Sequence, residues 1–167
     1  MVTTLLWCNQ MRYIILVCVI LAFIPKTHAD LKHKIETAAL NHDIDPALLM
    51  ALVEQESSFD PNVGRFEPNL YRRWGSREKA TSWGLTQVVL GWHGESCGVR
   101  TVKELLVPET NLDCGAKVLK RCIDKFGTIR KSLGCYNGDK TGKYASGVIK
   151  RYEKYAGINP SYTKALK

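Results

Sequence analysis

The sequence predicts a single all-α domain, and three observations support this fold class. Apolar residues recur at helical spacing in several segments, and no convincing pair of strand-like segments is visible. Turn-forming residues separate those segments. The 167 residues suffice for one domain and hardly for two, and a hydrophobic content of 45% is enough for a packed core.

Residues 1–29 have the pattern of a signal peptide. Arg12 precedes twelve uncharged residues, Tyr13 to Ile24. Thr27 and Ala29 place small residues at the two positions that a signal peptidase reads, which predicts cleavage after Ala29. The apolar run is shorter than the ~20 residues of an ordinary membrane span, although an uncleaved anchor is the alternative. We therefore expect a periplasmic or secreted protein with no stable membrane span after cleavage.

The cysteines agree with export. Four follow Ala29, an even number that suggests two disulfides in an oxidising compartment. Cys114 and Cys122 share a predicted helix about 12 Å apart, which is too far for a bond. Two pairings stay open: Cys97–Cys114 with Cys122–Cys135, or Cys97–Cys122 with Cys114–Cys135. We expect no metal or cofactor, because neither a CxxC pair nor a His-x3-His spacing points to zinc.

The formal net charge is +8, and +6 without residues 1–29, which contain Arg12 and Lys26. Such a balance suits an anionic partner: nucleic acid, a membrane surface or an acidic cell-wall polymer. No run of like charges with interleaved aromatic residues occurs, so we expect no nucleic-acid partner.

The chain is organised around a short helix that ends in a glutamate. Asp45 is a good N-cap and Pro46 fits the first helical position. Glu56 falls on the same helical face as the apolar residues Leu49, Leu52 and Val53, whereas Glu54 points to roughly the opposite side. Apolar surroundings and the helix C-terminus should both raise the pKa of Glu56, as a general acid requires. An ordinary surface glutamate is the alternative.

The remaining elements follow from spacing and turn signals. Residues 60–81 should be mostly loop with a short helix at 68–74, and such a long loop is usually functional or disordered. Residues 91–101 should form a loop that holds Cys97. Thr110 or Asn111 should cap a helix that Gly127 ends. The other predicted helices are residues 31–42, 102–106, 128–136 and 144–155.

Four separated motifs now line up. They are Glu56 to Pro61, Gly84 to Gln87, Asn111 with Gly115 and Leu119, and Cys135 to Gly138. Their order and spacing resemble those of the soluble lytic transglycosylase family, which shares the goose-type lysozyme-like fold. The likeness covers residues 35–155, and four motifs in order are specific where one would be weak.

The resemblance implies roles for five residues. Glu56 would protonate the glycosidic oxygen between N-acetylmuramic acid and N-acetylglucosamine and then act as the base that closes a 1,6-anhydro ring. One carboxylate suffices, unlike in most glycosidases. Gln87 and Tyr136 would contact the glycan or the catalytic glutamate, and Tyr136 would hold Glu56 by a hydrogen bond. Ser57 would shape the helix terminus beside the substrate, and Asn137 would be structural.

Two positions depart from the family pattern. Thr86 replaces the usual methionine, which would make the floor of the glycan site smaller and more polar. Cys135 replaces the usual alanine, which suggests a disulfide that braces the helix of Tyr136. Neither change removes the acid, so we still expect activity.

Glu67 is a second carboxylate candidate for the substrate site. It could raise the pKa of Glu56 or activate a water, and the reaction would then be hydrolysis. Alternatively, Glu67 pairs with Arg65, Arg72 or Arg73 and orders the loop.

Three tryptophans are candidates for stacking on sugar rings, because aromatic faces suit the apolar face of a pyranose. They are Trp74, Trp83 and Trp92. The alternative, which we favour for each, is an anchor of the core or of the loop.

The sequence therefore predicts an exported lytic transglycosylase with a domain at 30–157 and a tail at 158–167. Its expected partner is the glycan strand of peptidoglycan, and a secretion, conjugation or phage assembly is a further candidate. The alternatives are a hydrolytic muramidase, a non-catalytic wall-binding factor on a lysozyme-like scaffold, and a basic membrane-active protein.

Overall fold

The computed structural model describes residues 26–157 of the chain. The chain divides into two compact units, residues 1–32 and residues 33–167. Of the first unit the structure describes only the beginning of helix α2 (Lys26–Asn41). Residues 1–25 of the predicted signal segment and the predicted tail at 158–167 lie outside the described residues, whereas residues 26–29 of that segment belong to the beginning of α2. No helix among residues 26–157 is long and apolar enough to cross a membrane.

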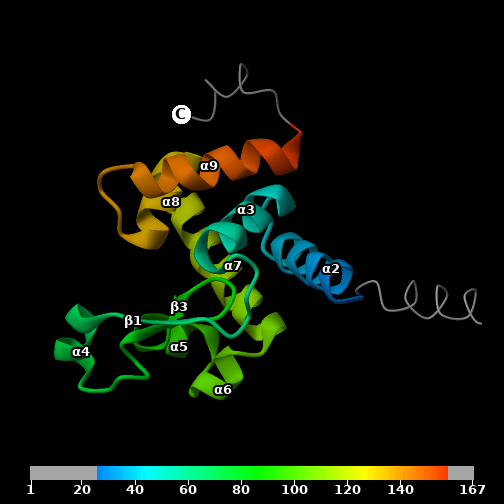
Figure 1. The fold of residues 1–167 in the computed structure, drawn as a ribbon. Helices are drawn as coiled ribbons and strands as arrows, with labels where there is room; N and C mark the ends of the chain where they lie inside the picture. The colour runs from blue at the N-terminus through cyan, green and yellow to red at the C-terminus, as the bar shows by residue number, and fades with distance from the viewer. Residues whose placement is uncertain (1–25, 158–167) are drawn as a thin grey trace, which may run out of the picture. The chain divides into compact units, whose positions relative to one another are not determined.

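Within the second unit, four helices pack around an apolar core. Helix α3 (Pro46–Ser57) packs against α9 (Lys143–Ala156), and α8 (Ile129–Asn137) packs against both α9 and α7 (Pro108–Phe126), as Figure 1 shows. The all-α prediction is confirmed in that helices dominate the described chain. The largest fully buried side chains of these helices are Leu49, Leu52, Val53, Leu112, Leu119, Leu133 and Val148.

A small antiparallel sheet corrects the expectation that no strands pair. Strand β1 (Gly64–Phe66) pairs with β2 (Thr81–Trp83), which pairs with β3 (Val88–Val89). These strands have two or three residues each, too few to show an alternating pattern in the sequence. Helix α4 (Pro68–Trp74) follows β1 and precedes β2 in the sequence, at the predicted position. The long segment after α3, residues 58–89, is therefore folded, and we call it the insertion.

Two further elements differ from their predicted form. Residues 91–101 were predicted as a loop, but residues 91–97 belong to helix α5 (Leu90–Cys97). A side chain at Gly91 or Gly94 would come within 2.7 Å of a backbone carbonyl, so close packing requires these glycines. Helix α7 begins at Pro108, before the predicted caps Thr110 and Asn111, and Gly127 ends it as predicted. Helix α6 (Val102–Leu105) lies within the predicted range of 102–106, and Thr101, which was predicted to belong to the loop, caps it.

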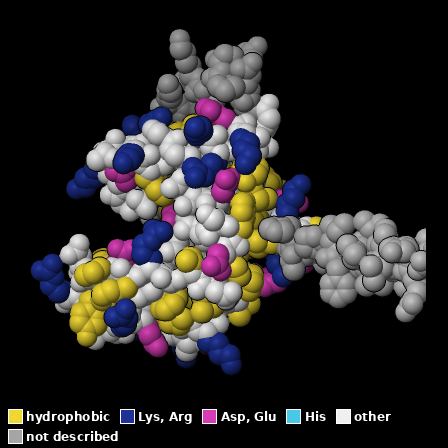
Figure 2. All heavy atoms as spheres, viewed as in Figure 1, with side chains coloured by type: hydrophobic (Ala, Val, Ile, Leu, Met, Phe, Trp, Pro, Cys, Tyr) yellow, Lys and Arg dark blue, Asp and Glu magenta, His cyan; other side chains and the backbone are white. Residues whose placement is uncertain are grey.

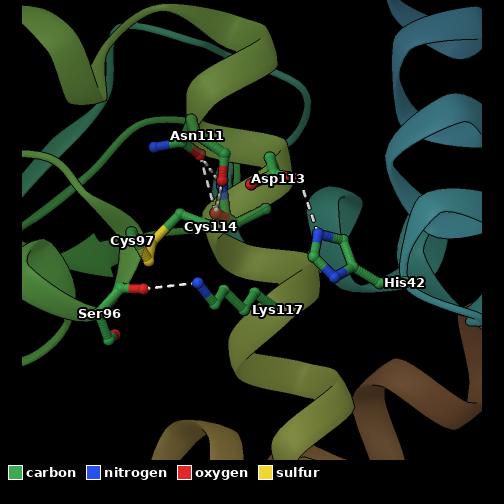
Figure 3. Close-up of polar contacts among 8 residues, drawn as sticks. His42, Ser96, Cys97, Asn111, Asp113, Cys114 and Lys117 are labelled. Carbon is green, nitrogen blue, oxygen red and sulfur yellow. Dashed lines mark hydrogen bonds and ion pairs between the residues drawn. A yellow bond between two sulfur atoms is a disulfide. The ribbon is translucent and has the colours of Figure 1, made fainter.

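Helix α7 lies between the turn that follows α2 and helix α5 (Figure 3). Asp113 accepts a 2.7 Å hydrogen bond from His42, in the turn after α2. On the other side of α7, the Lys117 Nζ donates to the Ser96 carbonyl at 2.7 Å, and Cys114 is bonded to Cys97 of α5. These contacts fix α7 on two sides, and α7 in turn carries the buried Asn111 described below.

The disulfides are Cys97–Cys114 and Cys122–Cys135, with Cα–Cα distances of 5.4 Å and 5.8 Å. This is one of the two pairings that the sequence left open. The second bond joins the end of α7 to α8, so it braces the helix that carries Tyr136, as predicted from Cys135.

Replacing Cys122 and Cys135 by serine is expected to lower the free energy of unfolding by about 3 kcal/mol, because the bond closes a 13-residue separation. The melting temperature of the purified chain should fall by about 8–12 °C in calorimetry. Addition of a thiol reductant should then shift the variant less than the wild type. An unchanged melting temperature would mean that this bond adds nothing to stability.

Candidate active site

Helix α3 carries Glu56 to its last turn. The Asp45 side chain accepts from the Ala47 amide at 2.8 Å, which starts the helix at Pro46. The helix ends where Ser58 adopts a left-handed conformation, with φ 52°. Glu56 is 7% exposed, which agrees with its place on the apolar face of the sequence pattern. Glu54 points to α9 instead, where it accepts a 2.5 Å hydrogen bond from Tyr155.

Burial is the main cause that raises the pKa of Glu56 above its ordinary value. Two neighbours oppose this effect: the Tyr144 hydroxyl, which donates to Glu56 Oε1, and the positive charge of Arg65. The negative charge of Glu67 adds to the rise. A carboxyl group in these surroundings holds its proton to a higher pH than an exposed glutamate, which suits a general acid.

Replacing these two charges is expected to move the pKa of Glu56 in opposite directions. Arg65→Gln removes an attraction for the carboxylate and should raise the pKa, whereas Glu67→Gln removes a repulsion and should lower it. A ¹³C NMR titration of the glutamate side chains would follow Glu56 directly, with Glu56→Gln identifying its signal. Shifts in the same direction for both variants would contradict the assigned charges.

Tyr144 is a site residue that the sequence analysis missed. The Asp139 carboxylate accepts from the Thr141 amide at 2.7 Å and from the Tyr144 amide at 2.8 Å, so it caps the beginning of α9. Asp139 also accepts a hydrogen bond from the Thr141 hydroxyl. This bond is the main cause, together with the two amide bonds, that lowers the pKa of Asp139 to about 2. The turn signal at residues 137–139 predicts where α9 begins, but only the packing of α9 on α3 brings Tyr144 to Glu56.

Glu56 lines a cavity of about 670 Å³. Helices α3, α7 and α8 form one side of this cavity, and residues between Arg65 and His93 form the other. In Figure 2 the surface is hollowed on the left, between the α8–α9 region and the part that contains α4. Predicted site residues on the wall are Glu56, Glu67, Gln87, Tyr136 and Trp92. The wall also contains Arg65, Asn137 and His93, and burial lowers the pKa of His93, which favours its neutral form.

Gln87 is held rigidly at the cavity wall. Its Nε2 donates to the carbonyls of Gly84 at 2.9 Å and Val63 at 3.2 Å. Its Oε1 has no partner among the described residues. Gln87 is a non-glycine residue with φ 49°, a backbone conformation that stabilising contacts must hold. A buried acceptor without a partner beside a cavity is suited to a hydroxyl or amide of a bound sugar.

Tyr136 does not hold Glu56 as predicted. Its hydroxyl donates to the Thr86 carbonyl at 2.6 Å, and the hydrogen bond to Glu56 comes from Tyr144. Burial raises the pKa of both tyrosines, so both hydroxyls remain donors. The charge of Glu56 also contributes to these shifts, which indicates that both rings lie close to it.

Thr86 is not part of the cavity floor. Its side chain is fully buried, and its hydroxyl and amide each contact the Asn111 side-chain oxygen at 2.8 Å. The Asn111 Nδ2 donates to the carbonyls of Trp83 and Leu105 at 2.9 and 3.0 Å. A side chain at Gly115 would come within 2.4 Å of Thr86. The second and third motifs therefore form one buried network that fixes the loop of Gln87.

Two other predicted substrate contacts lie away from the cavity wall among the described residues. The Ser57 hydroxyl donates to the Val53 carbonyl at 3.1 Å, within its own helix, which fits a role at the helix terminus. Trp83 packs against the cluster around Val88 and Leu90, and its Nε1 donates to the Glu78 carbonyl at 3.0 Å. Trp83 is thus an anchor of the insertion, as the alternative interpretation of the tryptophans stated.

Trp92 is the tryptophan on the cavity wall, and it is 46% exposed. The Arg73 guanidinium lies 4.5 Å from the centre of its ring, and the Trp74 ring meets it edge-on at 5.4 Å. Arg72 donates to Asn69 at 3.1 Å. In the described chain no ion pair joins Glu67 to Arg65, Arg72 or Arg73, so the ordering role suggested for Glu67 has no support in these contacts.

The fold and the site together define a class: mostly helical, lysozyme-like domains that present a buried carboxylate to a cleft. The family model of the transglycosylase SLT domain matches residues 33–158. The chain therefore belongs to this family, as the four motifs indicated, and the family supports a lytic-transglycosylase type of activity on peptidoglycan. The disulfides fit a protein that works outside the cytoplasm.

Proposed function

We propose that this protein is a lytic transglycosylase that cleaves the β-1,4 bond between N-acetylmuramic acid and N-acetylglucosamine in peptidoglycan. The observation that carries the proposal is Glu56, a buried carboxyl on a cavity wall in a chain of this family. Because its pKa is raised, Glu56 retains the proton that the first step of the reaction transfers to the glycosidic oxygen.

Glu56 acts in two steps. Its carboxyl proton passes to the glycosidic oxygen while the bond from that oxygen to C1 of the muramoyl residue breaks, and the N-acetylglucosamine end leaves as an alcohol. The Glu56 carboxylate then takes the proton of the muramoyl C6 hydroxyl, whose oxygen bonds to C1. A 1,6-anhydro ring forms, the carboxyl is restored and no water is consumed. The substrate's acetamido group supports the cationic centre between the steps.

The neighbouring residues orient and bind. Tyr144 holds one oxygen of Glu56, which leaves the other free to face the substrate. Gln87 offers its unpaired Oε1, and Tyr136 forms part of the wall beside it. Trp92 offers an exposed aromatic surface to a sugar ring. The assignment of Tyr144 rests on its hydrogen bond to Glu56, and those of Gln87, Tyr136 and Trp92 rest on the cavity that they share with Glu56.

A hydrolytic muramidase is the second candidate, and one observation favours it. Glu67 lines the same cavity as Glu56 and makes no ion pair among the described residues. A free carboxylate there could activate water, as the second carboxylate of an inverting glycosidase does. In that case the products would carry hydrated reducing ends.

We further propose that the chain is exported to the periplasm or beyond the cell. Residues 1–29 would be the signal peptide, residues 30–157 the enzyme and residues 158–167 a tail. The two disulfides support an oxidising compartment. A secretion, conjugation or phage assembly that must open the wall remains the proposed setting.

Product analysis tests the proposal. Residues 30–167, produced under oxidising conditions, are incubated with purified peptidoglycan, and the released fragments are weighed by mass spectrometry. We expect fragments lighter by one water than those of a muramidase, and none from Glu56→Gln. Glu95→Gln, an exposed glutamate on α5, is the matched control and should cleave normally.

The other outcomes point elsewhere. Hydrated reducing ends that disappear in Glu67→Gln would establish the muramidase instead. No fragments from the wild type, with intact binding to the wall, would favour a non-catalytic wall-binding factor. Membrane permeabilisation that survives Glu56→Gln would favour the basic membrane-active alternative.

A further inference from the structure

Positive charge is concentrated in the last three helices. Residues 117–157 contain eleven Lys and Arg against three Asp and Glu, whereas residues 33–116 contain eight against twelve. Figure 2 shows Lys and Arg side chains gathered over α8 and α9 at the top of the view. The formal charge of the protein therefore resides on one part of the fold, and it is not spread evenly.

Part of this charge forms a row on α9. Lys143, Lys150 and Lys154 lie seven and four residues apart, so they share one helix face. All three are exposed, and the buried residues Ala145, Val148 and Tyr152 occupy the opposite face. Lys140 precedes them in the turn before α9. We call Lys140, Lys143, Lys150 and Lys154 the lysine stripe.

Most of the stripe is not neutralised. Lys154 lies 3.9 Å from Glu54, but no ion pair joins Lys140, Lys143 or Lys150 to an acid in residues 26–157. Other basic residues of these helices are engaged: Lys120 pairs with Asp124, and Lys117 binds the Ser96 carbonyl. Like charges that face solvent together attract an anionic partner.

The stripe begins at a second cavity that adjoins the catalytic site. This cavity has a volume of about 510 Å³, and its wall includes Lys143, Gln55 and Tyr144. Asp139 also lies on this wall, where its carboxylate accepts hydrogen bonds from the Thr141 and Tyr144 amides. Tyr144 is the residue that binds Glu56, and Asn137 lines both cavities. Gly147 leaves room for the Gln55 side chain, whose Oε1 would lie 2.9 Å from an added Cβ. Because Asn137 lines both cavities, a chain bound at Glu56 can continue past Asn137 to Lys143 of the stripe.

We propose that the second cavity and the lysine stripe bind the acidic peptides carried by the muramoyl residues of the substrate. This inference rests on the proposed function, because it assigns the substrate as peptide-bearing glycan. The sugars of the strand are uncharged, whereas the peptides attached to it carry free carboxylates. Exposed ammonium groups at the end of the catalytic cleft complement those carboxylates.

The test measures binding in the Glu56→Gln background, so that no cleavage occurs. The stripe variant is Lys143→Glu with Lys150→Glu, and the matched control is Lys79→Glu with Lys103→Glu. All four lysines are exposed, and both pairs change the net charge equally. The two probes are purified peptide-bearing peptidoglycan and the same glycan strands after an amidase has removed the peptides.

We expect the stripe variant to bind peptide-bearing peptidoglycan about tenfold more weakly at low salt, and the control to bind it nearly normally. Both variants should bind the stripped strands equally, and about 0.5 M NaCl should abolish the difference. Circular dichroism and melting temperature confirm that both variants fold.

Three results would overturn the proposal: equal weakening on both probes, equal weakening by the control pair, or loss of binding only to anionic vesicles. A wild type that binds but yields no anhydro products would refute the proposed reaction and leave this inference standing.

Discussion

Glu56→Gln is expected to slow strand cleavage by about 10²–10⁴-fold, the usual contribution of a positioned general acid and base. The amide has the same shape but offers no acidic proton and cannot accept one. Release of anhydro fragments from peptidoglycan, measured per enzyme, gives the rate. Glu95→Gln, on an exposed site of α5, should retain the wild-type rate. Residual activity above a hundredth of the wild-type rate would show that another residue is the general acid.

The same substitution should stabilise the fold at neutral pH. Burial raises the pKa of Glu56 in the folded chain above the ordinary value of 4.5. The native state therefore binds this proton more tightly than the unfolded state. The free energy of unfolding falls as the pH rises from 4.5 through the higher pKa of the folded chain. Glutamine does not ionise, so the Glu56→Gln variant does not lose this free energy of unfolding at high pH. The melting temperature of the variant should therefore exceed that of the wild type at pH 7. The difference should vanish below pH 4.5, where both states are protonated.

Asn111→Ala is expected to lower the free energy of unfolding by about 3–5 kcal/mol, or the melting temperature by about 10–18 °C. Asn111 is 1% exposed and satisfies the Thr86 amide and hydroxyl together with two backbone carbonyls. Alanine would leave these groups buried without partners. Calorimetry of the purified chain measures the change.

The control for this prediction is Asn62→Ala, because Asn62 is exposed and lies in the turn after α3. Its melting temperature should stay within about 2 °C of the wild type. Asn111→Ala should also weaken glycan binding at permissive temperature, because the network positions the loop of Gln87. A change of less than 1 kcal/mol would show that the network is not essential.

Much of the fold could be predicted because it depends on local chemistry. Asp45 and Pro46 start α3, and the apolar spacing after them places Glu56 on the buried face. Gly127 ends α7 in a left-handed conformation, φ 68°, that glycine adopts without strain. The distance along α7 excluded a bond between Cys114 and Cys122. Each of these inferences uses residues within a few turns of one another.

The errors arose where packing overrides local pattern. Residues 91–101 were predicted as a loop, yet Gly91 and Gly94 lie in helix α5, where backbone carbonyls of other segments approach them too closely for a side chain. The strands of the sheet are held by pairing partners that lie outside each strand, Arg65 with Ser82 and Ser82 with Val89. No pattern within one strand of two or three residues can reveal such a partner.

Motif order, spacing and caps act locally along the chain, so they were enough to predict the family, the helical class and the identity of the buried carboxyl. Which hydroxyl binds Glu56, in contrast, depends on how the helices pack against one another. Tyr136 and Tyr144 lie on different helices, and the packing of α9 on α3 brings Tyr144 to the carboxyl while Tyr136 donates to Thr86. A contact across 88 residues depends on the relative placement of two helices, which no local spacing specifies.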